Sequence, residues 1–275
     1  MRQLDTKKRA QIVACLVEGN SLRSTCRITG AARDTVTKLL VDLVKACAQY
    51  HDRFVRNVAC KRIECDEVWS FCHAKEKNVP AEFKGQYVHG DVWTWTAICA
   101  DSKLIASSYI SDRSAEAAKE FINDLAIRLK HRVQLTTDGY RVYADAVEGA
   151  FGTDIDYAML VKIYGEDVTK AEKRYSPVKY TGSQKTVIQG KPDMERVSTS
   201  FVERQNLTMR MSMRRFTRLT NAFSKKIENL ECAVALHFMY YNFCRIHQTL
   251  RVTPAMEAGL TDHAWELEEL ISLLK

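Results

Sequence analysis

The chain has 275 residues, 46% of them hydrophobic, with 41 Lys and Arg against 34 Asp and Glu and a formal net charge of +7. That content can bury a full core and more than one domain. No apolar run approaches membrane-spanning length and no signal peptide precedes the first charged residues, so we expect an intracellular protein. The nine cysteines include no Cys-x-x-Cys pair, which indicates reduced thiols rather than a zinc ribbon.

The N-terminal segment holds the excess positive charge, because residues 1–61 contain 12 Lys and Arg against five Asp and Glu. A charge cluster of this kind favours a DNA-facing end of the molecule. Within it, Asp5 can cap a helix running to about Glu18, and Ser21 can start a second helix that ends before Gly30. Apolar residues at helical spacing predict a third helix over residues 32–47.

Three such helices predict a helix-turn-helix domain over residues 1–50, followed by a linker over residues 51–61. The start of the third helix would reach base edges in the major groove, and its candidate DNA-binding residues are Arg33, Thr35, Thr37 and Lys38. The alternative is a small helical bundle that only packs against the rest of the chain. The placement of the positive charge favours DNA binding.

Residues 62–71 are predicted to form a half-buried strand that carries acids in its middle. At a spacing of two, one face holds Ile63, Cys65, Glu67, Trp69 and Phe71, and the other holds Glu64, Asp66, Val68 and Ser70. A carboxylate in such a strand is costly unless it is paired or binds a cation, so metal binding is the first hypothesis. The alternative is a solvent-facing edge strand, where charge blocks further pairing.

Further strands and helices alternate down the chain. We expect a loop at 75–90, a hairpin of strands at 92–99 and 104–110, and a helix at 115–130. A strand at 133–137 then ends at Asp138, before a short helix at 142–147 and a strand at 157–163. Asp138 is a second carboxylate where the chain turns, although an Asp-Gly turn alone would also explain it.

The last third of the chain combines a polar segment, a third acid and a basic run. Residues 164–199 lack a clean period and form either a mobile loop or an inserted DNA-contacting lobe. A Ser/Thr cluster at 198–200 can cap a helix that carries Glu203 in its first turns, where the helix dipole alone also favours an acid. Between residues 204 and 226 there is no acid, and the candidate phosphate contacts are Arg204, Arg210, Arg214, Arg215, Arg218, Lys225 and Lys226. A solvated basic face is the alternative.

Three motifs carry a resemblance to a known family. Asp66-Glu67-Val68-Trp69-Ser70-Phe71, then Thr137-Asp138-Gly139-Tyr140, then Val202-Glu203-Arg204-Gln205-Asn206 resembles the acidic triad of DDE transposases, closest to the insertion-sequence-one family. The order and contexts match over roughly residues 60–250. The resemblance implies an α/β, RNase H-like catalytic domain at 62–250, with a five-stranded mixed sheet flanked by helices, and leaves residues 251–275 as a C-terminal helical tail.

The resemblance also implies a chemistry. Asp66, Asp138 and Glu203 would be the catalytic residues and would hold two Mg²⁺ or Mn²⁺ ions, which suit hard oxygen ligands. The enzyme would free a 3′-OH at the end of an insertion element and join it to target DNA, as a homodimer or higher oligomer on DNA. A cytoplasmic, nucleoid-associated protein of bacterial type is expected. Members of the family often carry a zinc-binding segment before the helix-turn-helix, and this sequence shows none.

Two other functions remain open on the sequence. An RNase H-like nuclease or resolvase would use the same acids and cleave without joining. A helix-turn-helix regulator would bind DNA only, but it leaves the three acids unexplained.

Overall fold

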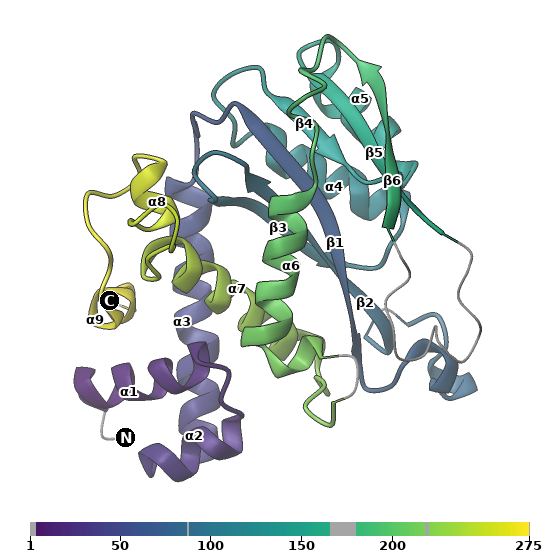
Figure 1. Cartoon of the computed structure of the whole chain (residues 1–275). Coiled ribbons are helices and arrows are strands. Elements are labelled where there is room, and N and C mark those ends of the chain that lie inside the picture. The colour runs from purple at the N-terminus through teal and green to yellow at the C-terminus, as the bar shows by residue number, and fades with distance from the viewer. Residues whose placement is uncertain (1–3, 87, 166–179, 218–219, 275) are drawn as a thin grey trace.

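The computed structural model describes residues 4–86, 88–165, 180–217 and 220–274. It is a mixed α/β structure in which helices flank both faces of a six-stranded sheet, with three N-terminal helices beside it (Figure 1). No helix among these residues is long and apolar enough to cross a membrane.

The N-terminal helices are α1 (Thr6–Val17), α2 (Leu22–Thr29) and α3 (Arg33–Phe54). Asp5 and Ser21 cap the first two, since Oδ1 of Asp5 accepts a hydrogen bond from the Lys8 N–H at 2.7 Å and Oγ of Ser21 accepts one from the Ser24 N–H at 3.1 Å. Both predicted caps are confirmed. The helix α3 runs past Cys47 and into the segment predicted as a linker, which is a correction.

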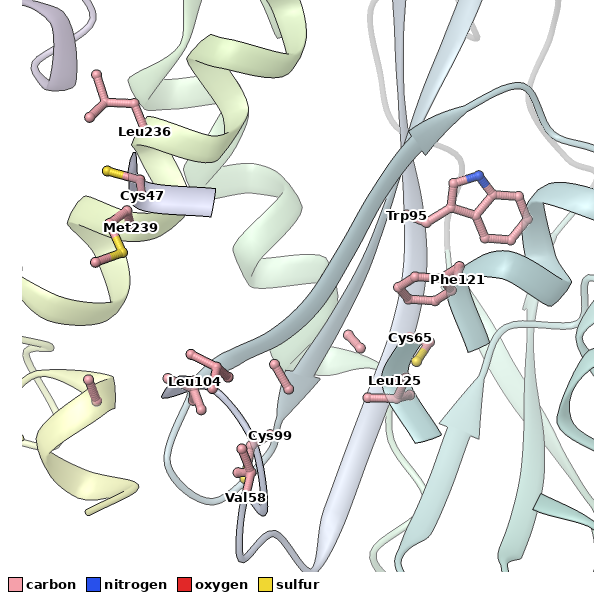
Figure 2. Packing of buried hydrophobic residues seen from close by; sticks show 14 of the residues in the cluster. Cys47, Val58, Cys65, Trp95, Cys99, Leu104, Phe121, Leu125, Leu236 and Met239 are labelled. Carbon is pink, nitrogen blue, oxygen red and sulfur yellow. The ribbon is translucent and has the colours of Figure 1, made fainter. Parts of the chain in front are cut away.

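The extra turns of α3 are stabilised by tertiary packing that the local sequence does not reveal. The ring of Tyr50 lies edge-on to Phe243 and Trp265 at centroid distances of 5.5 and 5.0 Å. Cys47 faces Leu236 and Met239 across the contact between α3 and α7 (Ile227–Phe243) (Figure 2). The N-terminal helices therefore share one hydrophobic core with the rest of the chain.

The sheet has the strand order β3-β2-β1-β4-β5-β6. Its strands are β1 (Arg62–Cys72), β2 (Gly90–Cys99), β3 (Ile105–Ser111), β4 (Gln134–Thr137), β5 (Asp156–Tyr164) and β6 (Tyr180–Gln189). The central strand β1 is antiparallel to β2 and parallel to β4, β4 is parallel to β5, and β6 returns antiparallel to β5. This mixed arrangement is consistent with an RNase H-like fold.

The sheet has one strand more than the five expected. The additional strand, β6, falls inside the segment 164–199 that was predicted as a loop or an inserted lobe. It lies at the edge of the sheet and is exposed on both faces, so it shows none of the alternation that marks a half-buried strand. Residues 166–179 of the same segment lie outside the described residues.

The two faces of the sheet are covered by different helices, as the alternation in β1 requires. Cys65 points to the face where α4 (Ala115–Ala126) and α5 (Val142–Phe151) pack, close to Trp95, Phe121 and Leu125 (Figure 2). Val68 points to the other face, against α6 (Ser200–Ser212) and α7. Because successive residues alternate, Asp66 lies on the α6 face and Glu67 on the α4–α5 face.

Short elements complete the described chain. Two 3₁₀ helices, η1 (Glu76–Asn78) and η2 (Ala81–Phe83), lie between β1 and β2, and η4 (Arg214–Phe216) follows α6. The tail forms α8 (Pro254–Glu257) and α9 (Leu267–Ser272). The buried amide of Asn242 joins α7 to β3, since it accepts a hydrogen bond from the Ile105 N–H at 2.9 Å and donates one to the Ile105 carbonyl at 3.0 Å.

Candidate active site

The register of the central strands brings Asp66 and Asp138 together. In the parallel pair β1–β4, Cys65 lies opposite Thr137, and the residue that follows each of them is an aspartate. Oδ1 of Asp66 accepts a hydrogen bond from the Glu67 N–H, and Oδ2 accepts one from Nδ2 of Asn206, both at 2.8 Å. Burial, and then the charge of Asp138, raise the pKa of Asp66 to about 6.

Asp138 is fixed by the turn that follows β4. Its Oδ1 accepts a hydrogen bond from the Tyr140 N–H at 2.9 Å. The residue between them must be small, because a Cβ on Gly139 would lie 2.6 Å from Cγ2 of Val161 on β5. The predicted Asp-Gly turn is therefore present, and it holds the Asp138 carboxylate in place at the end of β4.

Glu203 enters from the first turn of α6. Its Oε1 accepts a hydrogen bond from Oγ1 of Thr199 at 2.7 Å, and its Oε2 forms an ion pair with Lys162 of β5. Asp66, Asp138 and Glu203 line one pocket of about 540 Å³, together with Lys162, Thr199 and Tyr140. The structure thus brings the three predicted acids, which are far apart in sequence, to one place.

A fourth acid, Glu67, lies close to Asp66 and Asp138, although it is not among the predicted site residues. Carboxylate oxygens of Asp66, Glu67 and Asp138 all lie within 4.8 Å of one another, whereas Glu203 is outside that group. Burial, and then Asp138, raise the pKa of Glu67 to about 7. Its place on the apolar face of β1 was recognised in the sequence; its proximity to the strand end of β4 depends on the sheet order.

Two cations lie within the acidic cluster. Lys162 pairs with Glu203, and the guanidinium of Arg113 lies 3.2 Å from Oε2 of Glu67 and 3.9 Å from Oδ2 of Asp138. Arg113 stacks over the rings of Trp93 and Tyr140, at 4.6 and 4.0 Å from their centroids. Neither cation was singled out in the sequence, because each reaches the acids from a separate element.

Glu64 on β1 caps the N-terminus of α6, the helix that carries Glu203. Its Oε2 accepts hydrogen bonds from the N–H groups of Phe201 and Val202, at 2.8 and 3.1 Å. The residue at the cap position, Thr199, makes no capping bond of its own because its hydroxyl bonds Glu203. A carboxylate from β1 therefore caps α6 from outside the helix. Burial raises the pKa of Glu64 to about 7, against the effect of the two N–H groups.

The residues predicted to contact DNA lie in two places. Arg33, Thr35, Thr37 and Lys38 lie on the first turns of α3, where Lys38 pairs with Asp42 at 3.3 Å. The basic run begins on α6 with Arg204 and Arg210, continues through Arg214 and Arg215 of η4, and reaches the exposed Lys225 and Lys226. Arg215 is turned inward and donates to Oγ of Ser224 at 2.7 Å. Arg218 lies outside the described residues.

The donor set of the pocket fits a hard divalent cation. Asp66 and Asp138 offer adjacent carboxylates; burial and then the charge of Asp138 raise the pKa of Asp66, and a divalent cation would relieve the repulsion between the two. Glu203 lines the same pocket with a carboxylate that is now paired to Lys162. The set contains no thiol or imidazole, which favours Mg²⁺ or Mn²⁺ over zinc.

No family model matches the chain, and no curated protein matches it. Among solved structures the chain is similar to the piggyBac transposase synaptic complex with hairpin DNA, at 8% identity and a TM-score of 0.46, over 99% of this chain and 71% of that one. Similarity at this level establishes neither a shared fold nor a shared function.

Proposed function

We propose that the protein is a DDE-type DNA transposase, which cuts at the ends of an insertion element and joins the freed 3′-OH to target DNA. The observation that carries the proposal is the meeting of Asp66, Asp138 and Glu203 in one pocket, at a strand, a strand end and a helix. These are the contexts that the sequence resemblance to the insertion-sequence-one family implies. Packing alone gives no reason to gather acids there.

Asp66, Asp138 and Glu203 would hold the two Mg²⁺ or Mn²⁺ ions. When bound, such ions supply neutralised phosphate oxygens, an activated nucleophile and a stabilised leaving group. The chain's own groups orient the ligands: the Glu67 N–H and Asn206 fix the carboxylate of Asp66, and Thr199 fixes that of Glu203. Lys162 and Arg113 offset the repulsion between the acids.

Phosphate binding is assigned to the basic residues. Arg204 follows Glu203 on α6 and its side chain is exposed, so it is available to a DNA backbone that passes the pocket. Arg33, Thr35, Thr37 and Lys38 would contact element ends. Element ends come in pairs, so the active form would be a homodimer or a higher oligomer on DNA.

A strand-transfer assay tests the proposal against a nuclease or resolvase of the same fold. The substrate is an oligonucleotide duplex from the DNA that flanks the reading frame, already nicked to expose the 3′-OH, with a supercoiled plasmid as target. Joining to the plasmid in Mg²⁺ or Mn²⁺ supports a transposase. Hydrolysis without joining would identify a nuclease, and binding without any metal-dependent reaction would identify a regulator.

A further inference from the structure

A second cavity, of about 790 Å³, lies between the N-terminal helices and the segment after α6. Its cationic lining comes from two distant parts of the chain: Arg23 and Arg33 on one side, and Arg214, Arg215 and Lys225 on the other. We call these five residues and the cavity they line the basic cleft. No Asp or Glu occurs among the residues described as lining it, whereas the chain as a whole has 34 Asp and Glu against 41 Lys and Arg.

The two sides of the basic cleft meet at a close backbone contact between Gly19 and Ser212. Gly19, in the turn between α1 and α2, has φ +77°, and a Cβ placed there would lie 2.4 Å from the Ser212 carbonyl oxygen at the end of α6. Only glycine permits this approach without strain. In Figure 1 the N-terminal helices lie below and to the left of α6, on the side of its C-terminal end. Because Ser212 and Glu203 are both on α6, this contact places the turn between α1 and α2 at a defined distance from Glu203.

The polar groups of the basic cleft suit a phosphodiester. Hydroxyl and amide side chains such as Ser21, Asn20 and Asn221 line it beside the cations, and these are the types that contact phosphate and sugar. His237 lies at its buried base, where Nε2 has no hydrogen-bond partner among the described residues. Burial lowers the pKa of His237 to about 4, so at neutral pH the imidazole offers a polar atom without added charge.

The size of the cleft limits what can enter it. A cavity of 790 Å³ is in the range of sites for small molecules or a few linked groups, roughly 300–1,000 Å³, so it accepts a short stretch of one strand and excludes a whole duplex. From Glu203 to Ser212 the helix α6 rises roughly 14 Å at about 1.5 Å per residue. Consecutive phosphates of one strand advance about 3.4 Å along the axis of a B-form duplex, so a duplex whose axis runs parallel to α6 places about four of them over this distance.

We propose that the basic cleft binds the sugar-phosphate backbone of one DNA strand, about four phosphates from the bond that reacts in the acidic pocket. The proposal rests on the function proposed above, since it places the reacting strand along α6. It also changes the role expected for Arg33, which would contact backbone in the cleft and not a base edge. Binding at this position would align the strand by its phosphates and would be independent of sequence.

The test uses the full chain and two paired variants, Arg23→Gln with Arg33→Gln and Arg214→Gln with Lys225→Gln. The matched control is Lys119→Gln with Lys130→Gln, two exposed lysines at the α4 side of the sheet. Fluorescence anisotropy measures affinity for element-end DNA between 50 and 200 mM salt, without metal. Each cleft pair should weaken binding about tenfold and reduce the salt slope by roughly two contacts, on the order of 0.9 each.

Neutral methylphosphonates, placed one at a time along the strand, locate the contact. A substitution about four phosphates from the reacting bond should weaken wild-type binding, and should cost little more in the Arg214→Gln/Lys225→Gln variant because the partner is already lost. The proposal would be overturned if the methylphosphonate and the protein variant reduced binding additively at every position. A salt slope of the cleft variants equal to that of the control pair would also overturn it. If DNA is bound through the cleft but no reaction follows, the cleft stands and the transposase function fails.

Discussion

Among single residues, Glu64 and Asp66 lie on the same face of β1 but have different roles. Asp66 points into the acidic pocket, and Glu64 caps the helix that delivers Glu203. The sequence placed both acids on the same face but gave no sign of this division, because the capped helix begins more than a hundred residues later. A long-range cap leaves no local motif, unlike Asp5 and Ser21.

Glu64→Leu should remove the cap of α6 and cost about 0.5–2 kcal/mol of unfolding free energy. Misplacement of Glu203 should lower kcat for end cleavage at least tenfold while KM for DNA changes little. Glu64→Gln retains an acceptor oxygen and serves as the matched variant, with a smaller effect on both. Chemical denaturation and steady-state cleavage kinetics measure the two quantities. Full kcat in Glu64→Leu would show that the cap does not position Glu203.

Lys162→Met should tighten Mn²⁺ binding. The ion pair between Lys162 and Glu203 must be broken before Glu203 can bind a cation, and methionine removes that competition while keeping most of the side-chain volume. Isothermal titration calorimetry of the protein without DNA should give a Kd several-fold lower than that of wild type. Lys185→Met on β6 is the control, since that ammonium donates to the Met194 carbonyl and pairs with no acid in the part of the chain that the structure describes. Equal affinities for Lys162→Met and wild type would refute the competition.

At the scale of elements, most of the secondary structure could be predicted from caps, turns and periodicity. The strand pair 92–99 and 104–110 and the helix after Ser114 appear as β2, β3 and α4. The strand β6 and the last turns of α3 were not predicted, for two different reasons. An exposed edge strand has no alternation to detect, and the last turns of α3 depend on Phe243 and Trp265, which come from distant sequence.

The turn between α1 and α2 offers an element-scale test. Gly19→Ala places a Cβ 2.4 Å from the Ser212 carbonyl oxygen, whereas Gly30, with a similar φ of +69°, has open space around it. Both changes carry the strain of a positive φ, about 1 kcal/mol, but only Gly19→Ala must also displace a backbone contact. Thermal unfolding should show a larger loss of stability for Gly19→Ala, by roughly 1–3 kcal/mol. Equal losses would mean that the contact is not formed.

At the scale of the whole molecule, the N-terminal helices are part of the main core. Cys47 of α3 packs against Leu236 and Met239 of α7, so a deletion of residues 1–50 would expose buried apolar surface. The division into separate domains at residue 50 remains a prediction, and end recognition is better tested by point variants. The sequence predicted a site of three acids. The order of the strands in the sheet also brings Glu67, Arg113 and Lys162 to these acids, which the sequence alone does not show.

Thr37→Ala with Lys38→Ala should reduce preference for element ends if the start of α3 reads bases. Loss of base-edge contacts costs about 1–3 kcal/mol for the specific site and much less for other DNA. Competition binding between end DNA and a scrambled duplex measures the ratio of affinities. The control is Arg53→Ala, a basic residue near the other end of α3. An unchanged ratio would assign these helices a packing role only.

If Asp66, Asp138 and Glu203 act as one metal-holding unit, strand transfer should fail in each of the variants Asp66→Asn, Asp138→Asn and Glu203→Gln. Each variant should fold and bind end DNA as well as wild type or better, because repulsion with phosphate is relieved. Each should also lose both end cleavage and joining by several orders of magnitude, and double variants should lose little more.

Asp145→Asn, an exposed acid on α5, is the control and should leave both reactions unchanged. Glu67→Gln completes the series, since Glu67 shares the cluster but lies on the other face of β1. The measurement is the yield of joined product from pre-nicked end DNA in Mg²⁺ and in Mn²⁺. None of the three triad variants should join; joining by Asp66→Asn together with its loss in Glu67→Gln would show that Glu67, and not Asp66, is the metal ligand on β1.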